Sequence, residues 1–91
     1  MEKIKTLHPA GKTGVHISKH KYDQVKNAII GQLLVKGPLT HTELTKLVEH
    51  DLKHNFNGSI SWYVEAVKLD LEARKLIVRK HGSKDIYMVS P

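Results

Sequence analysis

The sequence predicts an α+β domain in which three helices are followed by a two-stranded hairpin. Ninety-one residues can build one small core and leave no room for a separate catalytic domain. Apolar residues recur at intervals of three and four up to residue 75, which indicates amphipathic helices. Two short β-rich runs then flank a Gly-Ser turn. These patterns divide the single domain, residues 1–91, into an N-terminal arm (1–17), a three-helix core (18–75) and a hairpin (76–91).

The first helix is expected to start after Ser18 and to end at Gly37-Pro38. Serine is a favoured N-cap residue, and glycine followed by proline stops a helix. The helical spacing predicts a buried stripe, flanked by Ala28 and Leu34, that consists of Tyr22, Val25, Ile29 and Leu33.

The second helix has the clearest start in the sequence, because Thr40-His41-Thr42-Glu43 fits a capping box. In that motif the threonine hydroxyl and the glutamate carboxylate satisfy two backbone amides that would otherwise lack a partner. Leu44, Leu47, Val48 and Leu52 should form its inner face, and the helix should end near Lys53 or His54.

The third helix, from Ser59 to Lys75, is apolar on two sides. Its core stripe is predicted to be Ile60, Tyr63, Val64, Val67 and Leu71, and the opposite stripe Trp62, Ala66, Leu69 and Ala73. A helix with two apolar sides is covered on both. The second cover is either the arm, through Ile4 and Leu7, or a second subunit. We favour the arm, because its apolar residues otherwise have nothing to pack against.

The hairpin should pair residues 76–78 with Ile86-Tyr87-Met88-Val89, and Leu39 should add a short third strand. The arm is expected to be extended, because Pro9, Gly11 and Gly14 oppose a helix. Three helices followed by a basic hairpin predict a winged helix-turn-helix, with the hairpin as the wing.

Two resemblances support this fold. Leu71-Glu72-Ala73-Arg74-Lys75-Leu76-Ile77 resembles the helix-to-wing junction of bacterial regulators, although Lys75 stands where many of them have glycine. Almost the whole chain is also similar to a family of small, stand-alone bacterial domains without assigned function. The residues that carry this second resemblance are Leu7-His8-Pro9, Gly11-Lys12, Lys21-Tyr22-Asp23, Gly58-Ser59, Trp62-Tyr63 and the segment 67–74. It implies a fold and no mechanism.

Charge is distributed unevenly along a chain whose formal net charge is +6. Residues 1–21 contain five lysines against one glutamate, and no acid lies between Ala73 and Lys84. Cations clustered in this way favour phosphate binding, since neutralised phosphates release counterions. A basic surface that only aids solubility is the alternative.

The predicted partner is therefore nucleic acid, in particular double-stranded DNA, as for a transcriptional regulator. In a helix-turn-helix protein the third helix contacts base edges, and a basic hairpin follows the backbone. The candidate contacts are Asn57, Ser59, Ser61, Lys68, Arg74, Lys75, Arg79, Lys80 and Lys84. Glu65 and Glu72 oppose this function, because we expect both carboxylates on the exposed face of the third helix, toward the phosphates. The alternative function is an interaction or homodimer module, whose surface would be Trp62, Ala66 and Leu69.

Other functions find little support in the sequence. Seven histidines without cysteine make a weak metal site, so we expect neither metal nor cofactor. No nucleophile or phosphate-loop motif is present, and an enzyme is not expected. The longest apolar run is far below the roughly 20 residues of a membrane span, and no secretory signal is visible, so we expect a cytoplasmic protein.

Overall fold

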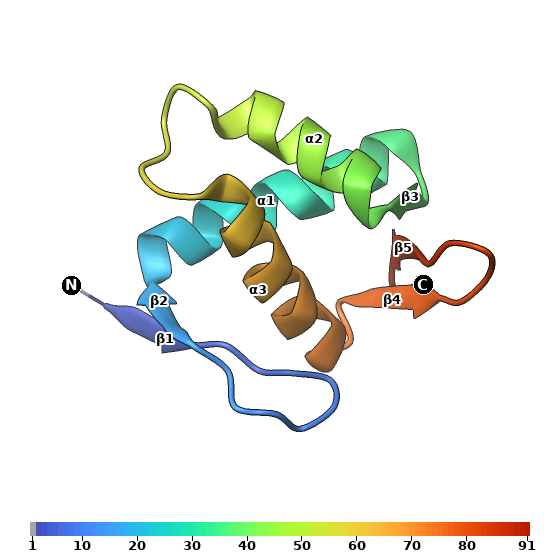
Figure 1. Cartoon of the computed structure of the whole chain (residues 1–91), viewed down its shortest axis with the longest axis horizontal. Helices are drawn as coiled ribbons and strands as arrows, with labels where there is room; N and C mark the ends of the chain where they lie inside the picture. Colours follow the sequence, from blue (N-terminus) through green and yellow to red (C-terminus); the bar gives the residue numbers. More distant parts are fainter. Residues whose placement is uncertain (1) are drawn as a thin grey trace.

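The computed structural model describes residues 2–91 and contains three packed helices with a small antiparallel sheet at each end (Figure 1). The helices are α1 (Lys19–Lys36), α2 (His41–Leu52) and α3 (Ile60–Ala73). One sheet consists of β1 (Lys3–Lys5) and β2 (His16–Ser18). The other consists of β3 (Leu39–Thr40), β4 (Ile77–Lys80) and β5 (Ile86–Val89). The predicted α+β class is confirmed.

The predicted starts of the first two helices are confirmed by their caps. The Ser18 hydroxyl accepts a hydrogen bond from the Lys21 amide at 3.1 Å. At the start of α2, the Thr40 amide donates to the Glu43 carboxylate at 2.9 Å, and the Glu43 amide donates to the Thr40 hydroxyl at 3.2 Å. The hydrogen bond from the Thr40 amide is the main cause that lowers the pKa of the Glu43 carboxyl, and the Thr40 hydroxyl lowers it further. Both reciprocal bonds of the capping box are therefore formed.

The core lies between the three helices and the three-stranded sheet. The predicted stripe of α1 is confirmed, since Tyr22, Val25, Ile29 and Leu33 are buried. Leu34 was expected beside that stripe but is exposed to solvent. Each residue along a helix is rotated by about 100° from the one before it, so Leu34 lies past the edge of the packed face that contains Leu33.

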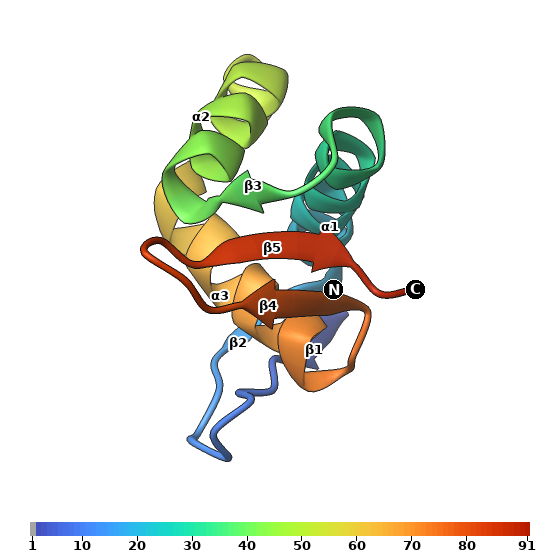
Figure 2. The same cartoon turned by 90° about the vertical axis from the view of Figure 1, so that its right-hand side faces the viewer.

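The sheet of β3, β4 and β5 has the order β3-β5-β4 (Figure 2). Leu39 pairs with Tyr87 in β5, which confirms the predicted third strand. In the hairpin, Ile77 pairs with Val89 and Lys80 with Ile86, so residues 81–85 form the turn. This register places Leu39, Ile77 and Tyr87 in the core.

The N-terminal arm forms a hairpin and is not merely extended. Ile4 pairs with Ile17, and residues 6–15 form a loop that folds against α3 (Figure 1). Thr6 closes this loop: its amide donates to the Val15 carbonyl at 2.8 Å, and its hydroxyl accepts from the Val15 amide at 2.9 Å. A Cβ at Gly14 would lie 1.8 Å from the Thr6 carbonyl oxygen, so this close approach requires glycine.

The arm covers the second side of α3, as predicted, although Ile4, which was expected to take part, pairs with Ile17 and packs against the core. Arm residues including Leu7 and Val15 line a hollow of about 190 Å³ together with Trp62, Ala66 and Leu69. Ala66 and Leu69 are only partly exposed beneath this loop, whereas Trp62 is 48% exposed. Leu7 is itself largely exposed and contributes mainly through its backbone, as described below. Of the predicted interaction surface of Trp62, Ala66 and Leu69, only Trp62 is therefore exposed.

Helix α3 ends at Ala73, two residues before the predicted Lys75. The Leu76 amide donates to the Leu71 carbonyl at 2.9 Å, and the Lys75 amide donates to the Glu72 carbonyl at 3.0 Å. This is a Schellman motif, which requires a left-handed residue directly after the cap, and Lys75 has a φ of 64°. The helix stops earlier because the chain must turn there into β4.

Replacement of Lys75 by glycine is expected to raise the free energy of unfolding by about 0.5–1 kcal/mol. A side chain in the left-handed region costs about 1–2 kcal/mol, and the greater backbone freedom of unfolded glycine offsets part of the gain. Urea unfolding measures the change. Lys53→Gly is the control, since Lys53 also follows a helix but has a right-handed φ of −56°, and there glycine should destabilise. Destabilisation by Lys75→Gly would contradict this description of the junction.

Candidate nucleic-acid interface

Helix α3 lies between two projecting loops. In Figure 2 the turn between β4 and β5 projects to the left and the arm loop projects toward the bottom, so the two loops extend in different directions. They form the walls of a cleft of about 410 Å³ whose floor is Leu69 and Glu72 of α3. The walls are His8, Pro9 and Ala10 from the arm, and Ile77, Val78, Arg79 and His81 from the hairpin. The residues that could contact a ligand therefore come from three separate parts of the chain.

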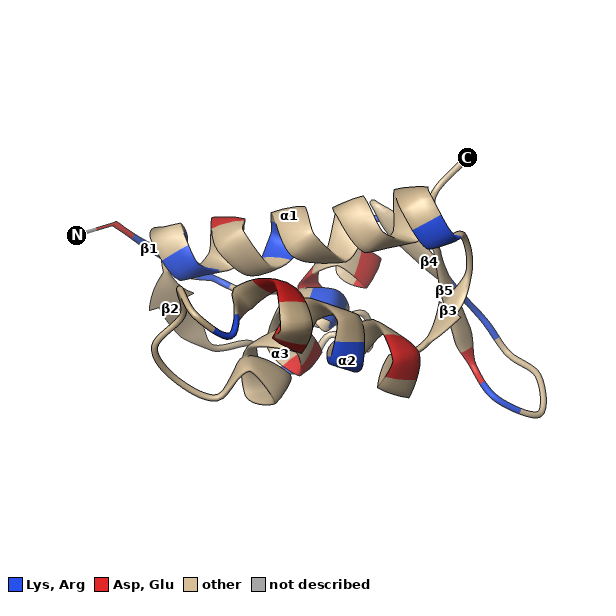
Figure 3. Ribbon diagram, turned by 90° about the horizontal axis from the view of Figure 1, so that it is seen from above, with Lys and Arg blue, Asp and Glu red and all other residues tan. Residues whose placement is uncertain are grey.

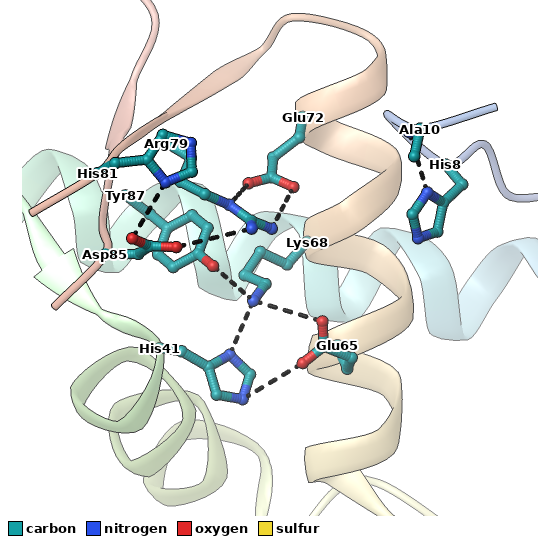
Figure 4. Close-up of polar contacts among 10 residues, drawn as sticks. All are labelled: His8, Ala10, His41, Glu65, Lys68, Glu72, Arg79, His81, Asp85 and Tyr87. Carbon is teal, nitrogen blue, oxygen red and sulfur yellow. Dashed lines mark hydrogen bonds and ion pairs between the residues drawn. The ribbon is translucent and has the colours of Figure 1, made fainter. Parts of the chain in front are cut away.

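Glu72 joins α3 to the hairpin through Arg79. The Arg79 Nε lies 2.7 Å from Glu72 Oε1, and Nη2 lies 3.0 Å from Oε2, in a bidentate pair (Figure 4). The hydrogen bond to Glu72 raises the pKa of the Arg79 guanidinium. The Glu72 side chain is only 6% exposed. The prediction that Glu72 faces solvent was therefore wrong, since the guanidinium covers and neutralises it. Arg79, expected at a phosphate, is engaged within the protein.

Lys68 is buried between α3, α2 and β5. Its ammonium donates to the Tyr87 hydroxyl at 3.1 Å, lies 3.0 Å from His41 Nδ1, and pairs with Glu65 at 3.4 Å (Figure 4). It also stands 4.3 Å from the centroid of the Tyr87 ring. The expected contact of Lys68 with nucleic acid is corrected here, because only 2% of the residue is exposed. Val64 lies four positions before Lys68 and Leu71 lies three positions after it, so all three share one helix face. This spacing could have revealed that Lys68 is buried.

His41 shares this network, and its imidazole Nε2 lies 3.5 Å from the Glu65 carboxylate. Burial lowers the pKa of His41, and the nearby Lys68 ammonium lowers it further. The Glu65 carboxylate raises the pKa of His41, whereas the Arg79 guanidinium lowers it. His41 therefore remains neutral to lower pH than an ordinary histidine and can serve as the acceptor for Lys68.

Asp70 is fully buried, and no functional role was predicted for it from the sequence. Its carboxylate accepts hydrogen bonds from the Leu7 amide at 2.8 Å, from the Tyr22 hydroxyl, and from Arg74 Nε at 2.8 Å. Burial and the bond to Asp70 raise the pKa of the Tyr22 hydroxyl. The bond to Asp70 raises the pKa of the Arg74 guanidinium. Asp70 thus ties the arm and α1 to α3, and Arg74, another predicted contact, is engaged in this intramolecular ion pair.

The N-terminus of α3 holds the three remaining polar candidates. The Ser59 hydroxyl caps the helix by accepting from the Trp62 amide at 3.3 Å, and it lies 3.2 Å from the Ser61 hydroxyl. The Asn57 carbonyl accepts from the Lys21 ammonium at 2.7 Å. All three residues are exposed. Ser59 therefore has a structural role, while the side chains of Asn57 and Ser61 face solvent.

The other three predicted cations are free on the surface. Lys75, Lys80 and Lys84 are exposed, and none forms an ion pair with any of residues 2–91. Figure 3 shows the hairpin of β4 and β5 extending away from the helices with basic positions on both of its sides. The one acid beside the turn, Asp85, is paired with Arg79 at 3.7 Å and lies 3.2 Å from His81 Nδ1. The exposed positive charge of the hairpin is thus carried by Lys80 and Lys84.

Two kinds of feature are absent from residues 2–91. No group of three or more histidine and acidic side chains is arranged to hold a metal ion. None of the helices in this part of the chain is long and apolar enough to cross a membrane.

The fold and its buried ion pairs define a small α+β domain in which α3 is joined by charged side chains to the arm and to the hairpin. The chain belongs to the family of unknown function DUF6958, whose model matches residues 3–87. This match confirms the resemblance to a family without assigned function. No curated protein and no solved structure matches the chain.

Proposed function

We propose that this protein is a winged-helix protein that binds double-stranded DNA, with the hairpin of β4 and β5 as the wing. The order α1, β3, α2, α3, β4, β5 supports this assignment, as does a sheet in which β5 lies between β3 and β4. In helix-turn-helix proteins the second helix of the motif enters the major groove, and that helix corresponds here to α3.

The observation that carries the proposal is the pairing of the acids on this face. Glu72 is neutralised by Arg79, Asp85 lies beside the same guanidinium, and Glu65 pairs with Lys68. Lys80 and Lys84 of the hairpin are exposed and form no ion pair within residues 2–91, although Lys84 lies near enough to Glu43 to help lower the pKa of that carboxyl. The hairpin beside α3 therefore presents accessible ammonium groups, which is what attraction to phosphate requires.

Helix α3 offers few groups for reading bases. Near its N-terminus, Ser61, Trp62 and Glu65 are exposed, whereas Lys68 is committed to the core. Hydroxyls hydrogen-bond to several bases, and a glutamate accepts from cytosine. Phosphate contacts should therefore dominate the affinity, and binding should depend weakly on sequence and strongly on salt.

The double substitution Lys80→Gln/Lys84→Gln is expected to weaken binding to a mixed-sequence duplex at least about tenfold at low salt. It should also reduce the slope of log affinity against log salt by about two, since each lost phosphate contact removes about 0.9. Fluorescence anisotropy of a labelled duplex, between about 50 and 200 mM salt, measures both quantities.

The control is Lys26→Gln/Lys36→Gln, which removes the same charge from α1. These two lysines form no ion pair within residues 2–91, and α1 lies along the side of the molecule opposite the hairpin turn (Figure 3). The control should bind nearly as tightly as the unsubstituted protein. Absence of binding at low salt, or equal losses in the two double variants, would refute the proposal.

A further inference from the structure

A second basic surface lies where the arm loop meets the end of α3. We call it the arm hollow; it has a volume of about 690 Å³. Three of the side chains that line it are lysines: Lys5 at the end of β1, Lys12 in the arm loop, and Lys75 after α3. Residues from the arm and from the end of α3 thus meet around one open hollow.

The charge of the arm hollow is not balanced within the described chain. Lys5, Lys12 and Lys75 are exposed and form no ion pair among residues 2–91. The one acid that lines the hollow is Glu72, and both of its carboxylate oxygens face Arg79. Three uncompensated ammonium groups around one hollow favour an anionic ligand with separated negative charges, such as consecutive phosphates of a nucleic-acid strand.

The backbone beneath these lysines is firmly held. The loop that carries Lys12 is closed by Thr6 and Val15 and is fastened to buried Asp70 through the Leu7 amide. The Lys75 carbonyl accepts from the Ser90 hydroxyl at 2.7 Å. A ligand would therefore have to order only the lysine side chains, which lowers the entropic cost of binding.

We infer that the arm hollow binds backbone phosphates of the same duplex that the hairpin contacts, so that the protein holds DNA on both sides of α3. This inference rests on the proposed function. The arm and the hairpin are the two walls of the cleft above α3. A helix in a major groove has one phosphate backbone on each side, across a groove about 12 Å wide. The wing would contact one strand and the arm hollow the other.

The test compares Lys5→Gln/Lys12→Gln with the hairpin pair Lys80→Gln/Lys84→Gln and with the α1 control pair, on the same labelled duplex. The arm pair should lower affinity at least about tenfold at low salt and reduce the salt slope by about two. The quadruple variant should lose about four from the slope, because the contacts are independent.

If the hairpin pair loses slope and the arm pair behaves like the α1 control, the inference is overturned while the proposed function stands. If the unsubstituted protein binds no duplex at low salt, both the inference and the proposed function fail.

A second measurement uses the absence of cysteine from the chain. Lys12→Cys and Lys84→Cys, each carrying a DNA-cleaving iron chelate, should cut the duplex at different positions on opposite strands. Cutting by the Lys84→Cys conjugate alone would overturn the inference.

Discussion

Replacement of Asp70 by alanine is expected to lower the free energy of unfolding by about 3–5 kcal/mol. The carboxylate has no exposed surface and accepts bonds from the Leu7 amide, the Tyr22 hydroxyl and Arg74. Its removal leaves a backbone amide and a phenol without partners, and each such buried group costs about 1–3 kcal/mol. Urea unfolding measures the loss. Hydrogen exchange at the Leu7 amide should also accelerate, because the arm loses its attachment to α3.

The matched control is Asp23→Ala. Asp23 also pairs with a cation four residues away, at 2.7 Å, but both side chains are about half exposed. Exposed pairs contribute roughly 0–1 kcal/mol, so this variant should be nearly as stable as the unsubstituted protein. Similar losses for the two variants would show that Asp70 is not the buried link between arm, α1 and α3.

Replacement of Lys68 by alanine is expected to cost about 3 kcal/mol. The substitution exposes a cavity where the aliphatic stem packed, at about 0.8 kcal/mol per methylene group, and it removes a charged donor from the Tyr87 hydroxyl and from His41. Lys68→Met keeps most of the packing and loses only the ammonium, so it should cost about half as much. Glu65 is 49% exposed and can be solvated by water in both variants. A Lys68→Met variant as stable as the unsubstituted protein would contradict a stabilising role for the ammonium.

The Lys68→Met variant should also change how the free energy of unfolding depends on pH. In the folded protein the pKa of His41 lies below its usual 6.5, so the unfolded chain binds the proton more tightly. This contribution to stability is fully present above pH 6.5 and is lost as pH falls toward the folded pKa. Because Lys68 is one cause of the depression, Lys68→Met should lose less stability than the unsubstituted protein between about pH 8 and pH 5. An unchanged or steeper loss would contradict this coupling.

Local signals in the sequence predicted most of the secondary structure. The capping box at Thr40 and the Ser18 cap depend on residues within four positions of each other, so they can be recognised without tertiary information. The two apolar sides of α3 likewise predicted that the arm would cover it. The hairpin within the arm was missed, because three-residue strands separated by a ten-residue loop leave only a weak period-2 pattern.

The role of charged residues was much harder to predict. Lys68 and Asp70 occur within the buried side of α3, and their partners Tyr87 and Leu7 lie 19 and 63 positions away in the chain. Helical spacing can indicate that Lys68 borders the core, but a charge near an apolar stripe is usually exposed, and only the tertiary structure identifies the partners of these residues. Glu72 and Arg79 pair between two different elements for the same reason. The exposed lysines of the hairpin are those that remain after these pairs are formed.

The DNA-binding proposal is tested most directly by titrating a mixed-sequence duplex into isotope-labelled protein at low salt and following its backbone amide signals. The proposal predicts shifts at residues 79–85 of the hairpin and at the N-terminal half of α3, with the exposed side of α1 unchanged. Shifts confined to α1, or no shifts at any duplex concentration, would contradict it.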